Sequence, residues 1–236
     1  MTHVLLTGST RGIGAAARDQ LKAAGARVIG HGSRANGDEQ LGADLLQPAA
    51  AEKLWSDALD RLDGRIDVLI NNAGIYEPAS VGESTEVWQE RWHRTMQINL
   101  QAAADLCRLA VSHFRSRAGG GRIVNVSSRA AYRGDSPEHW HYAASKAGMI
   151  GMTKSIARGF AGEEIYAWAV TPGFTMTGMA EDYLSSRGGE AIIRDIPLGR
   201  VNTAEEVANV ITYLALHAPA ATTGAVIDIN GASYVR

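Results

Sequence analysis

The sequence predicts an α/β fold, in which an open, doubly wound parallel sheet of about seven strands carries helices on both faces. Short runs of aliphatic residues alternate along the chain with longer segments of helical pattern. Strands that are separated by helices pair in parallel. The strand segments are also apolar throughout, which is typical of a sheet that helices cover on both sides.

The first half of the chain is expected to contain four strands and two helices. A helix over residues 15–24 ends at Gly25, a residue that commonly terminates helices. The next helix, over residues 49–62, follows Pro48, which suits the first turn of a helix. The strands are expected at residues 4–6, 27–29, 42–44 and 67–70.

The second half repeats the alternation of helix and strand. Residues 87–117 predict one long helix with a break, and residues 139–160 predict another. The last helix runs to residue 216 from Thr203, a residue type that commonly caps helices, and Glu205 and Glu206 suit the positive end of its dipole. The strands are expected at residues 122–126, 165–170 and 225–229.

The composition predicts one globular domain over residues 1–236. Apolar residues make up 45% and charged residues 20%, which is ordinary for a soluble protein with one core. The net charge of −2 provides no basic surface for nucleic acid. Cys107 is the sole cysteine, so a reducing cytoplasm is the expected location. We expect no leader, no membrane span and no metal site, since the histidines lack the spacing of metal ligands.

A glycine-rich turn joins the first strand to the first helix, with the spacing Gly-x-x-x-Gly-x-Gly. Glycine lets a ligand approach the main chain closely, and the free amides at a helix start attract a pyrophosphate. A tight turn without a ligand is the alternative, but the position between strand and helix favours a dinucleotide. The candidate cofactor residues are Gly8, Ser9, Thr10, Arg11, Gly12, Ile13 and Gly14.

The end of the second strand indicates which dinucleotide binds. NAD sites often place an acid here for the ribose hydroxyls, whereas arginine accommodates the 2′-phosphate of NADP. Residues 30–34 contain no acid, and Ser33 and Arg34 offer a hydroxyl and a planar cation. Arg11 can supply a second cation. NADP(H) is therefore favoured over NAD(H), with a solvated loop arginine as the alternative reading of Arg34.

A tyrosine and a lysine form the candidate acid–base pair. Tyr142 and Lys146 are four residues apart in a predicted helix and therefore share one face. A tyrosine loses its proton near pH ~10, and a neighbouring ammonium lowers that pKa. The pair can thus act as a tuned proton donor and acceptor. A surface tyrosine followed by a lysine through chance is the alternative.

Several motifs together resemble the short-chain dehydrogenase/reductase family over almost the whole chain. They are the glycine turn, Asn71-Asn72-Ala73-Gly74, Asn99, Ser128, Tyr142-x-x-x-Lys146 and Pro172-Gly173, in the order seen in the family. The resemblance implies a Rossmann-like sheet and an oxidoreductase that moves a hydride between nicotinamide and a carbonyl or alcohol. It also implies homotetramers or homodimers, paired through helices near residues 96–117 and 139–160.

The resemblance further implies roles for the catalytic residues. Tyr142 donates a proton to the substrate oxygen or removes it, while Lys146 holds the nicotinamide ribose and lowers the Tyr142 pKa. Ser128, rather than its neighbour Ser127, bonds the substrate oxygen where charge develops. Asn99 positions a water that links Lys146 to solvent. The interval from Ser128 to Tyr142 is about one residue longer than is usual in the family.

Further cofactor contacts follow from the same resemblance. Asp44 and Leu45 match a pair that meets the adenine, although a role in a turn is an alternative for Asp44. The segment after the fourth strand matches contacts with the ribose, and the Pro-Gly segment matches contacts with the nicotinamide. The residues concerned are Asn72, Ala73, Gly74, Pro172, Gly173, Thr175 and Thr177.

Substrate choice is expected at the carboxyl ends of the strands, where open α/β sheets bind ligands. Residues 75–81, 129–140 and 175–200 should meet there, and the last of these segments is expected to form a mobile lid. The candidate substrate residues are Ser128, Tyr132, Trp140 and Tyr142. The alternatives to an NADP(H)-dependent carbonyl reductase are a non-catalytic nucleotide-sensing protein and an epimerase or dehydratase that uses the same cofactor.

Overall fold

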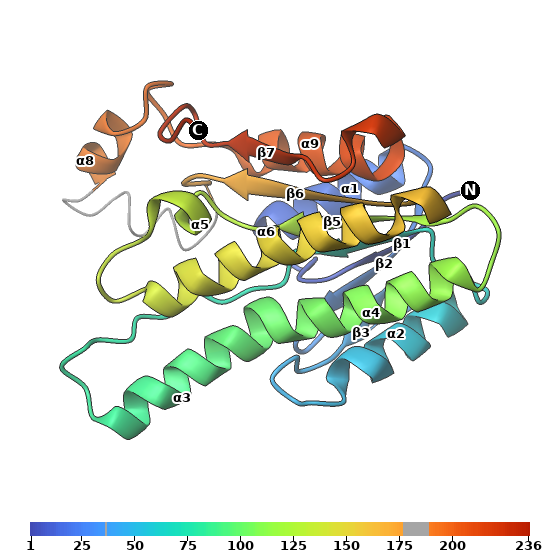
Figure 1. Cartoon of the computed structure of the whole chain (residues 1–236), viewed down its shortest axis with the longest axis horizontal. Coiled ribbons are helices and arrows are strands. Elements are labelled where there is room, and N and C mark those ends of the chain that lie inside the picture. Colours follow the sequence, from blue (N-terminus) through green and yellow to red (C-terminus); the bar gives the residue numbers. More distant parts are fainter. Residues whose placement is uncertain (36, 177–188) are drawn as a thin grey trace.

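The computed structural model describes residues 1–35, 37–176 and 189–236. Its seven strands form one sheet in the order β3-β2-β1-β4-β5-β6-β7. Each neighbouring pair of strands is parallel, and Figure 1 shows helices lying across the sheet. The predicted Rossmann-like, doubly wound parallel sheet is confirmed.

Strands and helices alternate along the described chain, as the sequence predicts. The strands are β1 (His3–Leu6), β2 (Arg27–Gly32), β3 (Gln40–Gly42), β4 (Val68–Asn71), β5 (Gly121–Val126), β6 (Ile165–Pro172) and β7 (Val226–Ile229). The α-helices are α1 (Gly12–Ala23), α2 (Ala50–Arg61), α3 (Thr85–Met96), α4 (Ala102–Arg115), α5 (Ala130–Arg133), α6 (Trp140–Phe160), α8 (Gly189–Arg194) and α9 (Ala204–Leu216). Shorter helical turns are η1 (Gln97–Gln101), η2 (Ala161–Glu163) and η3 (Ala220–Thr222).

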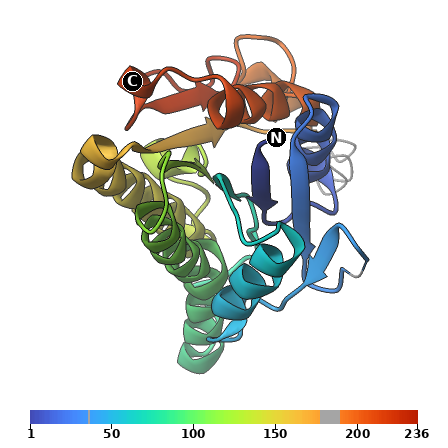
Figure 2. The same ribbon diagram turned by 90° about the vertical axis from the view of Figure 1, so that its right-hand side faces the viewer.

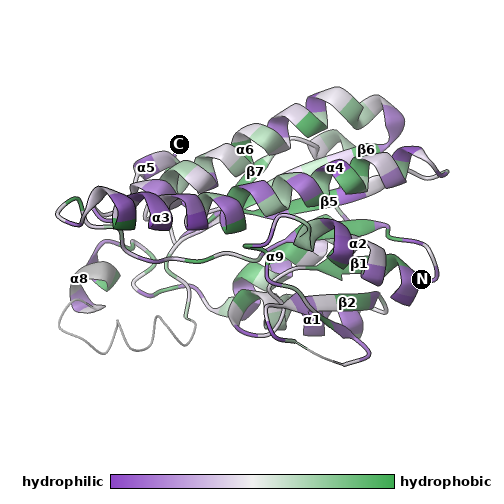
Figure 3. Ribbon diagram, turned by 90° about the horizontal axis from the view of Figure 1, so that it is seen from below, coloured by the Kyte–Doolittle hydropathy of each residue, from purple (hydrophilic) through white to green (hydrophobic). Residues whose placement is uncertain are grey.

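Two apolar cores lie between the sheet and its helices. Successive side chains of a strand point to opposite faces. Leu5 and Leu69 accordingly pack with residues of α2 and α4, while Val4 and Leu6 pack with residues of α1 and α9. Figure 2 shows helices on both sides of the sheet, and Figure 3 shows apolar residues concentrated along the strands. Burial on both faces explains why these strands are apolar throughout.

The long helix of the second half is interrupted by a π-helical turn. α3 begins after Ser84, whose hydroxyl accepts a hydrogen bond from the Val87 amide over 3.4 Å. The helix widens at η1 and resumes its α-helical pattern at Ala102. Turns of this kind often occur at functional sites, and this one contains Asn99. The sequence predicted a break in this helix. In the structure the break is a single π-helical turn, and the helix continues on both sides of it.

The expected third strand was placed two residues too late. β3 pairs with the last three residues of β2 and ends at Gly42, whereas the sequence indicated residues 42–44. Asp44 lies after the strand, and its carboxylate accepts a hydrogen bond from the Leu46 amide over 3.1 Å. This is a turn interaction, which the sequence left open as an alternative for Asp44.

The segments expected to border the substrate are partly helical. The short helix α5 follows Ser128, and the sequence does not predict it. Within the expected lid at residues 175–200, the structure describes residues 175–176 and α8 onward. Residues 177–188 lie outside the described part of the chain.

The expected cap of α9 is confirmed. The Thr203 hydroxyl accepts a hydrogen bond from the Glu206 amide over 3.2 Å, and the Glu206 carboxylate accepts one from the Thr203 amide over 2.8 Å. This reciprocal pair satisfies two backbone donors at the helix start. The same carboxylate pairs with Arg200. The hydrogen bond from Arg200 contributes most, and that from the Thr203 amide next, to lowering the pKa of Glu206 to about 2.

Cys107 is buried on α4 beside two asparagines. Its thiol accepts a hydrogen bond from Asn71 over 3.3 Å, and burial raises the pKa of the thiol to about 12. We expect the native protein to be inert to iodoacetamide at pH ~8, because only about one thiol in ten thousand is ionised there. Protein unfolded in urea should react completely under the same conditions. Rapid labelling of the folded protein would contradict the burial of this thiol.

Candidate active site

The glycine turn of residues 8–14 lies at the carboxyl end of β1. β1 pairs with β2 on one side and with β4 on the other, so the strand order reverses here. Open α/β sheets bind their ligands in the crevice at such a reversal. In a parallel sheet the segments that follow β1, β4, β5 and β6 all leave from this same edge, so the candidate residues on them share one region.

Asn72 and Thr7 hold the glycine turn against the end of β4. The Asn72 side-chain amide donates hydrogen bonds to the carbonyl oxygens of Thr7 and Gly8 over 3.1 and 2.9 Å. The Thr7 hydroxyl accepts hydrogen bonds from the amides of Asn72 and Ala73, over 3.0 Å each. Gly8 has a φ of 65°, which glycine adopts without strain. The turn is therefore held by its neighbours in one tight conformation.

Gly14 has no room for a side chain. A Cβ there would lie 2.0 Å from the Gly8 carbonyl oxygen and 2.6 Å from the Asn72 side-chain nitrogen. We expect Gly14→Ala to weaken dinucleotide binding about tenfold and to lower the free energy of unfolding by about 1–3 kcal/mol. Calorimetric titration and urea unfolding measure the two effects.

Gly151→Ala is the matched control for this substitution. A Cβ at this exposed position in α6 meets nothing within 4 Å, and alanine is a better helix former than glycine. The control should bind the dinucleotide normally and be as stable as the unaltered protein or more stable. Similar behaviour of the two variants would rule out the close packing at Gly14.

The start of α1 leaves backbone amides free for an anion. Arg11 stands at the N-cap without a side-chain hydrogen bond to the helix, and the first turn contains no acidic residue. Thr10 and Arg11 are exposed, and so are Ser33 and Arg34 after β2. Open amides at a helix start, with cations nearby, fit the phosphates of a dinucleotide.

Ser128 and Tyr142 come together at the carboxyl end of β5. The Ser128 hydroxyl accepts a hydrogen bond from the Ala130 amide over 3.1 Å. Tyr142 lies in the first turn of α6. Burial raises the pKa of Tyr142 to about 12. The neighbouring Ser128 hydroxyl acts in the opposite direction and lowers this pKa, but burial is the larger effect. Tyr142 is therefore a protonated phenol at neutral pH, with the serine hydroxyl close enough to act on its pKa.

Lys146 lies one helical turn after Tyr142 and is buried. Its ammonium nitrogen is 5.8 Å from the centre of the Tyr142 ring and donates a hydrogen bond to the Val126 carbonyl over 2.8 Å. Burial lowers the pKa of Lys146 to about 8. The expected shift of the tyrosine pKa is thus reversed in direction, because burial of the phenol dominates and the ammonium bonds to a backbone carbonyl.

Asn99 is buried in η1 and connects two segments of the site. Its side-chain oxygen accepts a hydrogen bond from the Ile75 amide over 2.8 Å, and its nitrogen donates to the Ile75 carbonyl over 2.9 Å and the Ser145 hydroxyl over 3.3 Å. Asn99 thereby ties the chain after β4 to α6. A Cβ at Gly74 would lie 3.3 Å from the Asn99 oxygen and 3.4 Å from the Lys146 nitrogen. The water assigned to Asn99 stays a prediction.

Ser127 has a different partner from Ser128. Its hydroxyl is buried and donates a hydrogen bond to the Lys146 carbonyl over 2.7 Å. This bond ties the end of β5 to α6, and it leaves Ser128 as the serine beside Tyr142. The catalytic role of Ser128 stays a prediction.

Comparison with known proteins shows which family the chain belongs to. A family model described as enoyl-(acyl carrier protein) reductase matches residues 8–232. The 3-oxoacyl-[acyl-carrier-protein] reductase FabG of Escherichia coli is 34% identical, over 98% of this chain and 96% of its own length. FabG of Thermotoga maritima is 38% identical, over 96% and 95%. An uncharacterized short-chain type dehydrogenase/reductase of Sinorhizobium fredii, y4mP, is 34% identical, over 97% and 94%. The chain belongs to the short-chain dehydrogenase/reductase family.

As a short-chain dehydrogenase/reductase, the protein is an oxidoreductase that uses a nicotinamide cofactor. The described residues fit such a group. The turn between β1 and α1 excludes side chains at Gly14 and leaves helix amides open. Gly74 borders Lys146, one helical turn from Tyr142. A dinucleotide can thus extend along backbone from α1 to Tyr142.

His31 is a residue of this cofactor region that sequence reasoning missed. The Gly8 amide donates a hydrogen bond to His31 Nδ1 over 3.3 Å, and His31 Nε2 donates to the Ala43 carbonyl over 2.9 Å. Burial lowers the pKa of His31, so the imidazole is neutral and can accept at Nδ1. One ring thereby links the glycine turn to the segment before Asp44. The available signal was a polar residue between two glycines in a buried strand.

The other residues expected to contact the cofactor lie on neighbouring segments. Leu45 is buried in the core beside α2. Pro172 ends β6, and the Thr175 hydroxyl donates a hydrogen bond to the Gly173 carbonyl over 3.0 Å. Thr177 lies outside the described residues. Their contacts with the cofactor stay predictions.

The two aromatic residues expected in the substrate pocket have other neighbours. The Tyr132 ring stacks with Tyr234 at 6.0 Å, next to the C-terminus. Trp140, at the start of α6, is 52% exposed. The described ring that meets Tyr142 belongs instead to Tyr76, at a centre-to-centre distance of 4.8 Å. Sequence reasoning missed Tyr76 as a single residue, although it placed the segment 75–81 near the substrate.

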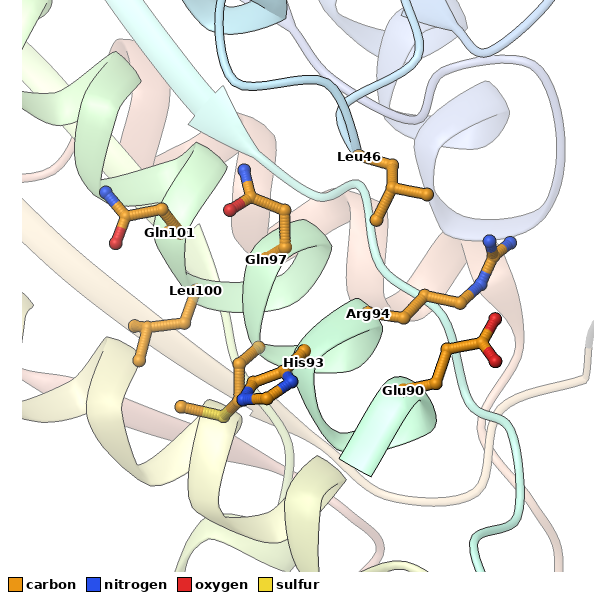
Figure 4. A pocket seen from close by; sticks show the side chains of 8 residues that line it. Leu46, Glu90, His93, Arg94, Gln97, Leu100 and Gln101 are labelled. Atoms are coloured by element: carbon orange, nitrogen blue, oxygen red, sulfur yellow. The ribbon is translucent and has the colours of Figure 1, made fainter. Parts of the chain in front are cut away.

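A surface cavity of about 570 Å³ is lined by other residues than these candidates. Figure 4 shows Leu46 across from side chains of α3 and η1. The residues that line it are Leu46, Glu90, His93, Arg94, Met96, Gln97, Leu100 and Gln101. None of them belongs to the Ser128, Tyr142 and Lys146 group.

Within residues 1–35, 37–176 and 189–236, no cluster of three His, Cys, Asp or Glu side chains could hold a metal ion. The helices of that same part of the chain include none with the length and apolar character to cross a membrane.

Proposed function

We propose that this protein is an NADP(H)-dependent reductase that converts a ketone or a 3-oxoacyl-type substrate into the alcohol. The observation that carries the proposal is the meeting of the Ser128 and Tyr142 hydroxyls, close enough for the serine to lower the pKa of the phenol against burial, with the Lys146 ammonium one helical turn behind. Two adjacent hydroxyl donors can hold one carbonyl oxygen while negative charge develops on it. The names of the FabG relatives support the substrate class.

Each side chain of the group has a separate task. The nicotinamide, when bound, supplies the hydride. Tyr142 donates its proton to the substrate oxygen, and its pKa of about 12 keeps the phenol protonated beforehand. Ser128 bonds the same oxygen. Lys146, with a pKa of about 8, is charged at neutral pH and stabilises the phenolate that the proton transfer leaves.

The preference for NADP(H) rests on the residues after β2. Ser33 and Arg34 are exposed there, and Arg11 is exposed on the neighbouring glycine turn. Residues 30–35 contain no acid that could bind the ribose hydroxyls of NAD or repel a phosphate. Arginine matches the geometry of a phosphate with two parallel hydrogen bonds. We therefore place the 2′-phosphate between Arg34 and Arg11.

A panel of ketones, acyl thioesters, sugars and quinones tests the proposal, with the loss of NADPH absorbance as the measurement. We expect turnover with at least one 3-oxo ester or thioester, and a lower KM for NADPH than for NADH. Tight NADPH binding without turnover of any carbonyl would favour the nucleotide-sensing alternative. A cofactor that is retained through turnover would favour an epimerase or dehydratase.

We further propose that residues 1–236 act as one domain in the cytoplasm, with residues 175–200 as a lid over the substrate.

Figure 1 shows α4 and α6 running side by side along one face of the molecule. Two such helices can pair with the same helices of a second copy, which supports a homodimer or homotetramer. Light scattering of the purified protein tests this assembly, and a monomer at micromolar concentration would refute it.

A further inference from the structure

A row of aromatic rings runs from α3 to the catalytic tyrosine. The rings belong to Trp88, Trp92, His141, His139, Tyr76 and Tyr142. Their successive centres are 5.2, 6.3, 6.3, 3.9 and 4.8 Å apart. These are contact distances for aromatic pairs. His139 and His141 are buried in this row, so the ring that offers surface beside the Tyr142 phenol is that of Tyr76.

Tyr76 is the member of the row next to Tyr142, and its orientation is held from two sides. Its ring lies parallel to His139, with 3.9 Å between centres and 6° between planes. Its hydroxyl donates a hydrogen bond to Asp135 over 3.0 Å. His139 is itself held, since its Nδ1 lies 2.7 Å from the Ser136 hydroxyl. The two rings thus form a wall whose geometry exists before a substrate binds.

The charges on this wall favour a neutral substrate group. Burial lowers the pKa of His139, so its ring carries no charge at neutral pH. Asp135 contributes a carboxylate at the edge of the wall, where it accepts the Tyr76 hydrogen bond. A carboxylate repels anionic groups. The wall of Tyr76, His139 and Asp135 therefore suits a flat, uncharged group.

We propose that Tyr76, backed by His139, selects substrates whose carbonyl carbon carries an aromatic ring or another flat, neutral group. This inference rests on the proposed function, because it assumes that Ser128 and Tyr142 hold the substrate oxygen. The group on the carbonyl carbon then lies beside the Tyr142 phenol, within reach of a ring only 4.8 Å away. Tyr76 is 45% exposed, so its ring offers surface to a ligand.

Two 3-oxo esters that differ only on the carbonyl carbon test this selection. Ethyl benzoylacetate carries a phenyl group there, and ethyl acetoacetate carries a methyl group. The quantity to compare is kcat/KM for each ester with NADPH, in the unaltered protein and in Tyr76→Ala and Tyr76→Phe. Tyr213→Ala is the matched control, because Tyr213 is 48% exposed on the distant helix α9.

The unaltered protein should prefer the phenyl ester. Tyr76→Ala should lower the phenyl-to-methyl ratio of kcat/KM about tenfold, because the stacking surface is lost. Tyr76→Phe should keep the ratio within about twofold, since the ring stays. The ratio should not change in Tyr213→Ala. An unchanged ratio in Tyr76→Ala would overturn the inference, even if both rates fell, because Tyr76 would then act only by supporting Tyr142.

Equilibrium binding separates this inference from the proposed function. Calorimetric titration of both esters into protein saturated with NADP⁺ gives their Kd values without turnover. A phenyl preference that Tyr76→Ala removes would uphold the selecting wall even if neither ester were reduced. Reduction of both esters without a phenyl preference would overturn the wall and leave the proposed function intact. If neither ester binds in preference to the other, the wall is overturned, whereas the proposed function is overturned only if no carbonyl of the whole panel is reduced.

Discussion

Replacing Tyr142 with phenylalanine should lower kcat for carbonyl reduction by about 10²–10⁴-fold, which is the contribution of a positioned general acid. The change removes one hydroxyl and leaves the ring, so the contact with Tyr76 at 4.8 Å should persist. The glycine turn lies on separate segments of the sheet edge, so the Kd for NADPH should change less than about twofold. Absorbance kinetics and calorimetric titration measure the two quantities.

Tyr213→Phe is the matched control for this prediction. It removes the same hydroxyl from a tyrosine on α9, and kcat should be unaffected. Turnover by Tyr142→Phe close to that of the control would mean that another group donates the proton. If Tyr142→Phe loses both NADPH binding and turnover, the hydroxyl instead supports the cofactor site.

Replacing Arg34 with aspartate should reverse the cofactor preference. Loss of charge-assisted hydrogen bonds to the 2′-phosphate is worth about 1.5–3 kcal/mol, which corresponds to roughly 10–150-fold in kcat/KM for NADPH. The new carboxylate also repels the phosphate and can accept hydrogen bonds from the ribose hydroxyls of NADH. The ratio of kcat/KM for NADPH to that for NADH should therefore fall by about 10²-fold or more.

Two further variants make this result interpretable. Arg158→Asp introduces the same change of charge at an exposed position in α6 and should leave the ratio unaltered. Arg11→Ala tests the second cation, on the glycine turn. If Arg34→Asp leaves the ratio unchanged while Arg11→Ala lowers it, the phosphate is bound at Arg11, and the assignment to Arg34 is wrong.

The candidate catalytic residues could be located in the sequence because each stands in a short motif. Tyr142 and Lys146 are one helical turn apart on α6, so their spacing alone places them on one face. Ser128 lies two residues after the end of a predicted strand. Residues that act through distant contacts lacked such a signal. The His31 ring bonds to the amide of Gly8, 23 residues away, and Tyr76 meets a histidine from another segment of the site edge.

The same contrast between features set by neighbouring residues and features set by distant contacts appears in the local backbone geometry. The helix containing Asn99 was expected, together with a break, because its apolar pattern is periodic. The widened turn itself accompanies hydrogen bonds from the Asn99 side chain to Ile75 and Ser145, which lie on other segments. Likewise, pairing with β2 rather than residue preference decides that β3 ends at Gly42. Neither feature can be derived from a window of neighbouring residues.

The sequence by itself determined the order of strands and helices, the burial of both sheet faces and the choice of the candidate catalytic group, because periodicity and spacing act within single elements. The tertiary structure decided the state and surroundings of that group. Desolvation by converging segments raises the pKa of Tyr142 to about 12 and lowers that of Lys146 to about 8. Neighbours that are remote in sequence place Tyr76 and His139 beside the phenol. Burial and ring contacts depend on which segments meet in space, and only the folded chain brings them together.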